Sequence, residues 1–152
     1  MADRIYYEDL SVGDVESFGS YEVTEAEVVE FAERYDPQWF HTDPEAAEES
    51  IYGGLIASGW HTASMTMRLL VDGHFTNAAS LGAAGLEELR WPNPTRPGDV
   101  LTAEIEILEK RVSESNPDRG IVTTKTTTTN EEGETKLQMV SVVFYQRRDA
   151  GE

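Results

Sequence analysis

Apolar positions in the first part of the chain recur with the period of a helix. Thr24 and Glu27 stand in the order of a capping box, in which the threonine hydroxyl accepts a first-turn N–H and the glutamate reaches back. The residues that follow have i, i+3, i+4, i+7 spacing and form one apolar face: Val28, Phe31, Ala32 and Tyr35. Because Pro37 disfavours helical geometry at Asp36, we expect this helix to end there and to leave Asp36 in a loop.

Two further helices are expected before residue 72. Asp43 is a cap residue and Pro44 suits the first helical position, which predicts a short helix over Pro44–Glu49. Residues 58–71 carry small side chains, methionines and a single charge, which predicts a helix buried on most sides. Its apolar face is expected to contain Trp60, Ala63, Met67, Leu70 and Val71, extended by Ser64 and Met65.

The second half of the chain changes to the period of a strand. Apolar residues alternate with polar ones over residues 101–108, and residues 121–129 are rich in threonine, which suits a pleated strand. Further strands are expected over residues 15–23, 85–91 and 135–146, with a hairpin turn at residues 130–133. This order predicts a single α+β domain over residues 1–152, in which an antiparallel sheet wraps against one long helix.

Composition excludes several classes of protein. The chain has 12 basic and 29 acidic residues and a formal charge of −17, which argues against binding nucleic acid or an anionic membrane surface. It contains no cysteine, so disulfides, thiolate catalysis and cysteine zinc sites are excluded. No apolar run is long enough to span a membrane, and the start MADRIYYEDL is acidic, unlike a signal peptide. We therefore expect a cytoplasmic globular protein.

The scarcity of lysine and the clustering of carboxylates add to this description of the surface. Only three lysines occur, and carboxylates crowd segments such as residues 45–50 and 130–134. This composition resembles that of proteins from salt-loving archaea, in which concentrated salt screens the repulsion between carboxylates. The alternative is an ordinary acidic protein of a dilute cytoplasm.

Candidate chemistry centres on one of the three histidines. His61 falls in the first turn of the long helix, where a structural role is expected, and His74 lies near a helix end, where a surface role is the default. His41 instead occurs in a predicted loop, five residues after Asp36 and next to aromatic residues. An imidazole near a carboxylate suits general acid–base catalysis. A metal site that adds Asp43 lacks the usual second histidine.

The segment Phe31–Met65 resembles the MaoC-like, (R)-specific enoyl-CoA hydratase family. Its DPQWFHTD stretch is similar to the family motif D-x-N-P-x-H-x-D, and GGLIASGW is similar to GG-x-I-A-H-G-M. The later segment Leu89–Ile107 resembles the family's strand and P-x-x-x-GD-x-L element. The resemblance covers most of the chain and implies a hot-dog fold, in which a curved antiparallel sheet surrounds a long central helix.

The resemblance also implies roles for particular residues. Asp36 and His41 match the catalytic pair that holds and activates water, one taking its proton while the other manages protonation of the substrate α-carbon. Gly59 matches the glycine whose backbone N–H binds the thioester carbonyl. The implied reaction is reversible addition of water to a trans-2-enoyl-CoA, giving a 3-hydroxyacyl-CoA. It needs no metal or redox cofactor, coenzyme A enters as part of the substrate, and the implied assembly is a homodimer.

Departures from the motif mark the expected substrate pocket. Gln38, Trp39 and Ser58 stand where the family has Asn, Pro and His, and Ser64 on the long helix is a further pocket candidate. Met67 is expected in the core rather than in the pocket. For the coenzyme A phosphates we expect Arg90 and Arg96. Other cations near strand ends are Lys110, Arg111, Arg147 and Arg148, and for each of the six the alternative is ordinary surface pairing with carboxylates.

Two other functions remain open at this point. The same fold could carry a thioesterase, which would need a carboxylate aimed at the thioester carbonyl and would make less use of His41. It could also be a non-catalytic acyl-CoA-binding subunit, an alternative that the substitutions Gln38 and Trp39 keep open.

The acidic composition leads to a first prediction. The melting temperature should rise between dilute buffer and about 1 M KCl, because at that ionic strength the Debye length falls to ~3 Å and the surface carboxylates no longer repel one another. Differential scanning fluorimetry over a KCl series measures the change. A melting temperature that stays constant across the series would contradict the halophilic interpretation.

Overall fold

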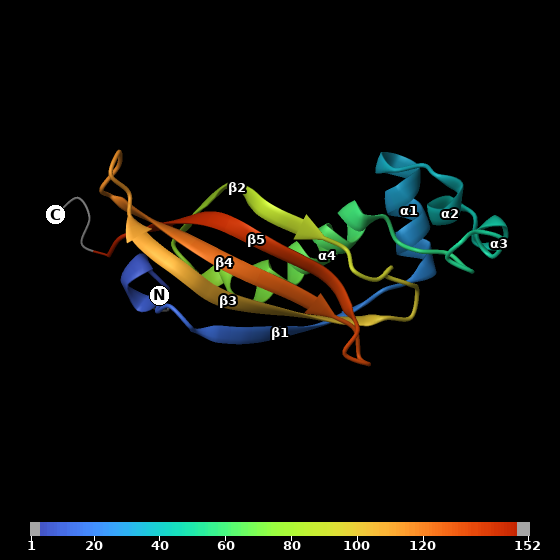
Figure 1. The fold of residues 1–152 in the computed structure, drawn as a ribbon, viewed down its shortest axis with the longest axis horizontal. Helices are drawn as coiled ribbons and strands as arrows, with labels where there is room; N and C mark the ends of the chain where they lie inside the picture. The colour runs from blue at the N-terminus through green and yellow to red at the C-terminus, as the bar shows by residue number, and fades with distance from the viewer. Residues whose placement is uncertain (1–3, 149–152) are drawn as a thin grey trace.

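Five antiparallel strands form one sheet that packs against a single long helix (Figure 1). The computed structural model describes residues 4–148, so the first three and last four residues of the predicted domain lie outside it. The strands follow the order β1-β3-β4-β5-β2 across the sheet. Their bounds are β1 Val15–Glu22, β2 Ser80–Arg90, β3 Val100–Val112, β4 Arg119–Thr129 and β5 Thr135–Gln146. The predicted α+β architecture with an antiparallel sheet around a central helix is confirmed.

The helices are concentrated before the second strand. The long helix is α4 (Gly59–Gly73), and three shorter helices precede it: α1 (Glu25–Tyr35), α2 (Trp39–Thr42) and α3 (Pro44–Ala47). Two 3-10 turns, η1 (Tyr7–Asp9) and η2 (Phe75–Asn77), complete the elements. In Figure 1, α1–α3 lie together at one end of the sheet, whereas η1 and the end of β5 lie at the other end.

Helix α1 has the predicted boundaries, but its capping differs in one respect. The Thr24 hydroxyl accepts the Glu27 backbone N–H at 3.3 Å, and Asp36 ends the helix with φ −153° and ψ 66°. The Glu27 side chain does not reach back to complete the predicted box. Its carboxylate instead accepts a hydrogen bond from the Tyr21 hydroxyl and lies 3.5 Å from His61 Nε2. The box pattern is local in sequence, whereas these two partners come from other elements.

The face that α4 buries differs from the predicted one. Trp60 and Met67 were expected on the apolar, buried face, yet they are 59% and 46% exposed. The buried residues of α4 are His61, Thr62, Met65, Thr66, Leu69 and Leu70. The buried face of the helix is therefore rotated relative to the face that hydrophobicity alone selects, so that Thr66 faces strand β4 and Thr62 faces Thr95 in the segment between β2 and β3.

Hydrogen bonds explain why α4 can bury its threonines. The Thr62 hydroxyl donates to Thr95 Oγ1 at 2.9 Å, and the hydroxyls of Thr66 and Thr128 on β4 lie 2.7 Å apart. Thr66 Oγ1 also lies 2.9 Å from the carbonyl oxygen of Thr62, one turn earlier. A buried hydroxyl with a partner costs little, whereas an unpaired one costs about 1–3 kcal/mol. A hydropathy pattern counts these residues as polar and cannot recognise their partners.

The strands differ in how clearly the sequence revealed them. Alternate residues of β4 are buried and β5 has the predicted bounds, so both were found. Strand β2 begins at Ser80, five residues before the predicted start at Gly85. Residues 81–87 are all exposed, and the register with β5 shifts three times, so this edge strand lacks a two-residue burial period.

The threonine pair between α4 and β4 gives the second prediction. Thr66→Val should lower the free energy of unfolding by about 1–3 kcal/mol, because it leaves the Thr128 hydroxyl buried without a partner. Urea denaturation of Thr66→Val, Thr128→Val and the double variant measures the coupling. We expect the double variant to lose less than the sum of the two single losses. Strict additivity would contradict the role of the pair.

Candidate active site

Asp36 and His41 meet at the end of the sheet where α1, α2 and α4 converge. His41 Nε2 lies 3.4 Å from Asp36 Oδ2, and His41 is 5% exposed. The other ring nitrogen, Nδ1, lies 2.8 Å from the carbonyl oxygen of Ile56. Asp36 lies in the predicted loop, but His41 sits on the one-turn helix α2 rather than in a loop. Four residues are too few to create an apolar period, so the sequence did not reveal this helix.

Two side chains hold the Asp36 carboxylate. Ser58 Oγ donates to Oδ2 at 2.7 Å, and Gln38 Nε2 donates to Oδ1 at 2.6 Å. Burial alone would raise the pKa of Asp36, but the hydrogen bonds from Ser58 and Gln38 and the nearby His41 together lower it below its ordinary value of 3.8. Asp36 is therefore an anion at neutral pH.

The pair opens into a cavity of about 450 Å³. The lining combines aromatic and apolar side chains with several polar groups, a mixture that suits a small-molecule site. Besides Asp36 and His41, the lining residues are Phe40, Tyr52, Ile56, Ala57, Ser58, Gly59, Trp60, Thr62, Trp91, Pro92, Asn93, Pro94 and Thr95. The sequence analysis noted the aromatic residues beside His41 but did not assign Tyr52, Trp60 or Trp91 to the pocket, because these come from separate segments that show no shared pattern.

Gly59 forms part of this lining as the first residue of α4. A backbone N–H at this position has no acceptor within its own helix, and the helix dipole favours negative charge beside it. Gly59 is also required sterically: a Cβ there would lie 2.6–2.9 Å from ring atoms of Trp91. The site therefore combines an anion-favouring N–H with a tryptophan wall that packs against the glycine.

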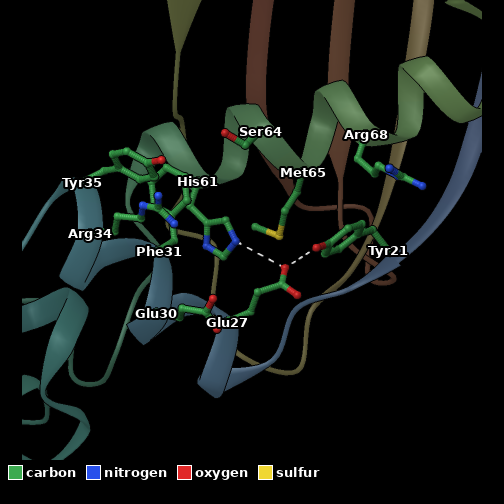
Figure 2. A pocket seen from close by; sticks show the side chains of 10 residues that line it. All are labelled: Tyr21, Glu27, Glu30, Phe31, Arg34, Tyr35, His61, Ser64, Met65 and Arg68. Atoms are coloured by element: carbon green, nitrogen blue, oxygen red, sulfur yellow. Dashed lines mark hydrogen bonds and ion pairs between the residues drawn. The ribbon is translucent and has the colours of Figure 1, made fainter.

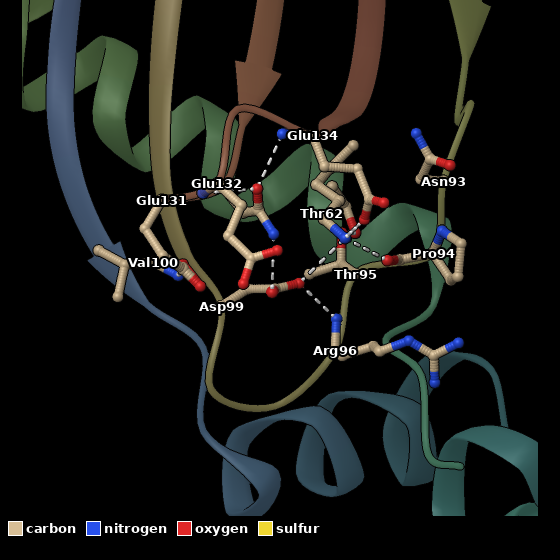
Figure 3. Close-up of polar contacts among 12 residues, drawn as sticks. Thr62, Asn93, Pro94, Thr95, Arg96, Asp99, Val100, Glu131, Glu132 and Glu134 are labelled. Carbon is tan, nitrogen blue, oxygen red and sulfur yellow. Dashed lines mark hydrogen bonds and ion pairs between the residues drawn. The ribbon is translucent and has the colours of Figure 1, made fainter. Parts of the chain in front are cut away.

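The segment Trp91–Asp99, which supplies one wall, is anchored by polar contacts (Figure 3). Asp99 accepts the Arg96 backbone N–H at 2.8 Å and lies 3.3 Å from Lys136 Nζ. Lys136 is 1% exposed and donates to the carbonyl oxygen of Pro94 at 2.8 Å and to Glu134. Together with the bond between Thr62 and Thr95, these contacts fix the wall against α4 and the β4–β5 hairpin.

Three expected pocket residues lie outside this lining, and one lies within it. Ser58 lines the cavity through its contact with Asp36. Gln38 is exposed and contacts the outer oxygen of Asp36, and Trp39 is 51% exposed beside Phe40. Ser64 donates to the carbonyl oxygen of Trp60 at 2.8 Å and lines a different cavity.

The candidate cations for coenzyme A divide into two groups. Arg90 pairs with Glu88 just before Trp91, and Arg96 donates to the Tyr52 carbonyl oxygen at 2.7 Å, so both lie near the cavity wall. The others lie at the far end of the sheet, where they contact η1 or neighbouring segments: Lys110, Arg111, Arg147 and Arg148. These four are too far along the sheet to serve this cavity.

A second cavity of about 310 Å³ lies on the other side of α4 (Figure 2). His61 stacks on Phe31 with ring centroids 4.7 Å apart, and its Nε2 faces Glu27. Its Nδ1 is buried and has no hydrogen-bond partner within residues 4–148. Only one of the two ring nitrogens of this histidine, for which a structural role was expected, therefore has a polar partner. Burial lowers the pKa of His61 below 6.5, and the opposing effect of Glu27 is weaker because that carboxylate is 45% exposed.

His74 is not on the surface, contrary to expectation. It is 5% exposed, and its Nε2 lies 2.8 Å from the Tyr145 hydroxyl in the core. Burial lowers the pKa of this imidazole as well. The predicted position of His74 near the end of α4 is confirmed, but the strand that covers it, β5, is distant in sequence.

Within residues 4–148, no group of three His, Asp or Glu side chains is arranged to hold a metal ion. Asp43, the third member of the metal site considered above, accepts the Ala46 backbone N–H at 3.1 Å and caps α3. In the same residues, no helix combines the length and the apolarity that crossing a bilayer requires.

The antiparallel sheet around the long helix α4 defines a hot-dog protein, and an Asp–His pair lies at the start of that helix. Residues 12–130 match the MaoC like domain, and the chain belongs to this family of dehydratases and hydratases. It is 48% identical to the MaoC-like dehydratase from Rhodospirillum rubrum, with a TM-score of 0.89 over 95% of this chain and 98% of that chain.

Two other relatives carry names that describe a reaction. The (R)-hydratase from A. caviae involved in PHA biosynthesis is 27% identical, with a TM-score of 0.71 over 90% of this chain and 97% of that chain. The 3-hydroxyacyl-thioester dehydratase Z of Mycobacterium tuberculosis is 32% identical over 100 residues, which are 62% of this chain and 66% of that protein. The match thus covers just under two thirds of that dehydratase.

The buried histidines give the third prediction. Because the folded pKa of His61 lies below 6.5, the unfolded chain takes up a proton first as pH falls, so stability should decrease from about pH 7.5 to about pH 5.5. His61→Phe keeps the stacking on Phe31 and should make this decrease shallower, with the remainder due to His74. Urea denaturation midpoints of the wild type and of His61→Phe, measured between about pH 7.5 and about pH 5.5, test this prediction. Equal slopes for both proteins would contradict this account.

Proposed function

We propose that the protein catalyses the reversible addition of water to a trans-2-enoyl-CoA, giving a 3-hydroxyacyl-CoA. The observation that carries this proposal is the convergence of Asp36 Oδ2 and His41 Nε2 at 3.4 Å on a cavity that includes the first N–H of α4. Membership of the MaoC-like family and the names of two relatives, a hydratase and a hydroxyacyl-thioester dehydratase, support the same reaction class.

The tautomer of His41 explains how the pair would hold water. The carbonyl oxygen of Ile56 can only accept, so Nδ1 carries a proton and donates to it. In the neutral imidazole, Nε2 is then a bare acceptor that faces the carboxylate, which is also an acceptor. A water molecule can satisfy both by donating one hydrogen to each. Its oxygen is thereby oriented for attack on the substrate β-carbon.

The reaction also requires a group that stabilises negative charge on the thioester, and the start of α4 supplies it. As water adds to the β-carbon, negative charge develops on the thioester carbonyl oxygen. The free N–H of Gly59 and the positive end of the helix dipole favour that charge. The α-carbon then receives a proton from the catalytic pair. Arg96, and more peripherally Arg90, are the proposed contacts for the phosphates of coenzyme A.

The fourth prediction concerns the catalytic pair. Asp36→Asn and His41→Ala should each lower the hydration rate by about 10²–10⁴-fold, the usual contribution of a general acid or base. The assay follows loss of the conjugated double bond of short and medium 2-enoyl-CoA in molar KCl, with free thiol measured in parallel. Thiol release would instead indicate a thioesterase, and no reaction would indicate a binding subunit. Circular dichroism confirms that each variant is folded.

We also propose that the protein is a homodimer joined along β2. This strand is one of the two edges of the described sheet, so one row of its backbone groups faces away from the other strands, and Leu81 and Leu86 are 52% and 49% exposed. Beside it, Met67 and Val71 on the outer face of α4 line an apolar cavity of about 410 Å³. A second copy placed against this edge would cover the strand and the cavity together.

The fifth prediction tests this assembly. Light scattering coupled to size-exclusion chromatography should give about twice the 17.0 kDa chain mass. Leu86→Lys should shift the distribution toward the monomer, because it places a charge on the proposed interface. Val12→Lys, another exposed apolar position that lies away from β2, serves as the control. A monomeric wild-type protein would contradict the proposal.

A further inference from the structure

Ser58 makes two hydrogen bonds whose directions are fixed by chemistry. It is the residue before α4 and has 0% exposure. Its hydroxyl accepts the Trp60 backbone N–H at 3.3 Å, and it lies 2.7 Å from Asp36 Oδ2. A backbone N–H can only donate and a carboxylate can only accept, so the single hydroxyl hydrogen points at Asp36. The cap of α4 is therefore also a donor to the proposed catalytic carboxylate.

This arrangement determines which form of Asp36 the site prefers. Gln38 donates to Oδ1 and Ser58 donates to Oδ2, so a proton added to either oxygen would compete with an existing donor. Both bonds therefore favour the anion. Of the titratable side chains that line the cavity, His41 faces Asp36 from α2, and Tyr52 is the only other. Arg34, on the last turn of α1, lines the second cavity instead.

We propose that Ser58 is a positioning residue that keeps Asp36 a carboxylate, which leaves His41 Nε2 as the atom that carries the proton. The inference rests on the function proposed above and divides the roles within the pair. An O–H bond of water breaks and its proton moves to Nε2, while the oxygen bonds to the β-carbon and the electron pair of the double bond moves into the enolate. The same proton then passes to the α-carbon, so His41 returns to its starting state and Asp36 stays ionised.

The test must separate this role from simple helix capping. Ser58→Ala removes both the cap and the donor. Ser58→Gly also removes the donor, but a glycine cap costs a helix only a few tenths of a kcal/mol. Ser58→Thr keeps the hydroxyl. Thr24→Ala removes the cap of α1, which has no contact with the Asp36 side chain, and serves as the matched control.

The first measurement does not depend on activity. ¹³C-carboxyl NMR titration of aspartate-labelled protein, with the Asp36 signal assigned by its loss in Asp36→Asn, should place the wild-type midpoint below 3.8. Ser58→Ala and Ser58→Gly should each raise the midpoint by about one pH unit, the usual effect of losing a hydrogen bond to a charged group. Ser58→Thr and Thr24→Ala should leave it low. An unchanged midpoint in both Ser58→Ala and Ser58→Gly overturns the inference.

The second measurement tests the catalytic consequence. The rate of Ser58→Gly relative to wild type should fall as pH is lowered from about 6 to about 4, because the raised midpoint lets a growing share of Asp36 become protonated while the wild-type carboxylate stays ionised. A relative rate that is constant with pH overturns the catalytic part of the inference, even if the NMR midpoint moves. Absence of hydration in the wild-type protein, or full activity in Asp36→Asn, instead refutes the proposed function. The NMR titration then still decides whether Ser58 controls the charge of Asp36.

Discussion

The hydrogen bond from Ser58 to Asp36 joins the three elements on which the site depends. It ties the end of α1 to the start of α4, and Asp36 in turn faces His41 on α2. The same hydroxyl caps the helix that carries Gly59. One buried side chain thus contacts both the proposed acid–base pair and the N-terminus of α4. Loss of either hydrogen bond of Ser58 would move the carboxylate, the imidazole and the anion-favouring N–H relative to one another.

Several of the 12 basic residues of this acidic chain hold backbone carbonyl oxygens in place. Lys136 is almost wholly buried and holds the wall segment through Pro94 and Asp99, and Lys110 bonds to carbonyl oxygens of Tyr7 and Leu10. Arg96 also donates a hydrogen bond to the backbone carbonyl oxygen of Tyr52. Because Lys136 is almost wholly buried, salt screens its contacts less than it screens ion pairs on the surface. The cavity itself is lined by aromatic and apolar side chains together with several polar groups.

The elements with a strong local signal could be predicted from the sequence. The Thr24 cap of α1, the stop at Pro37 and the alternating strands β4 and β5 agree with the structure. The predicted apolar face of α1 is only partly confirmed, because Val28 and Ala32 are buried whereas Tyr35 is 65% exposed. The predictions of burial were wrong where a hydrogen-bond partner far away in the sequence determines which side chain is buried. Thr62 and Thr66 are buried because their hydroxyls meet Thr95 and Thr128, which rotates α4 away from the face that hydropathy favoured. For the same reason His74, bonded to Tyr145, is internal rather than exposed.

By itself, the sequence determined the fold class and selected Asp36, His41 and Gly59, because a motif records residue types at fixed spacing along the chain. Only the tertiary structure decided how these residues meet. It places Ile56 against Nδ1 and Ser58 against Oδ2, and it packs Trp91 on Gly59 from a segment about thirty residues later. The charge of a carboxylate and the tautomer of an imidazole depend on donors and acceptors within about 3 Å. Those neighbours are set by chain packing and leave no periodic trace in the sequence.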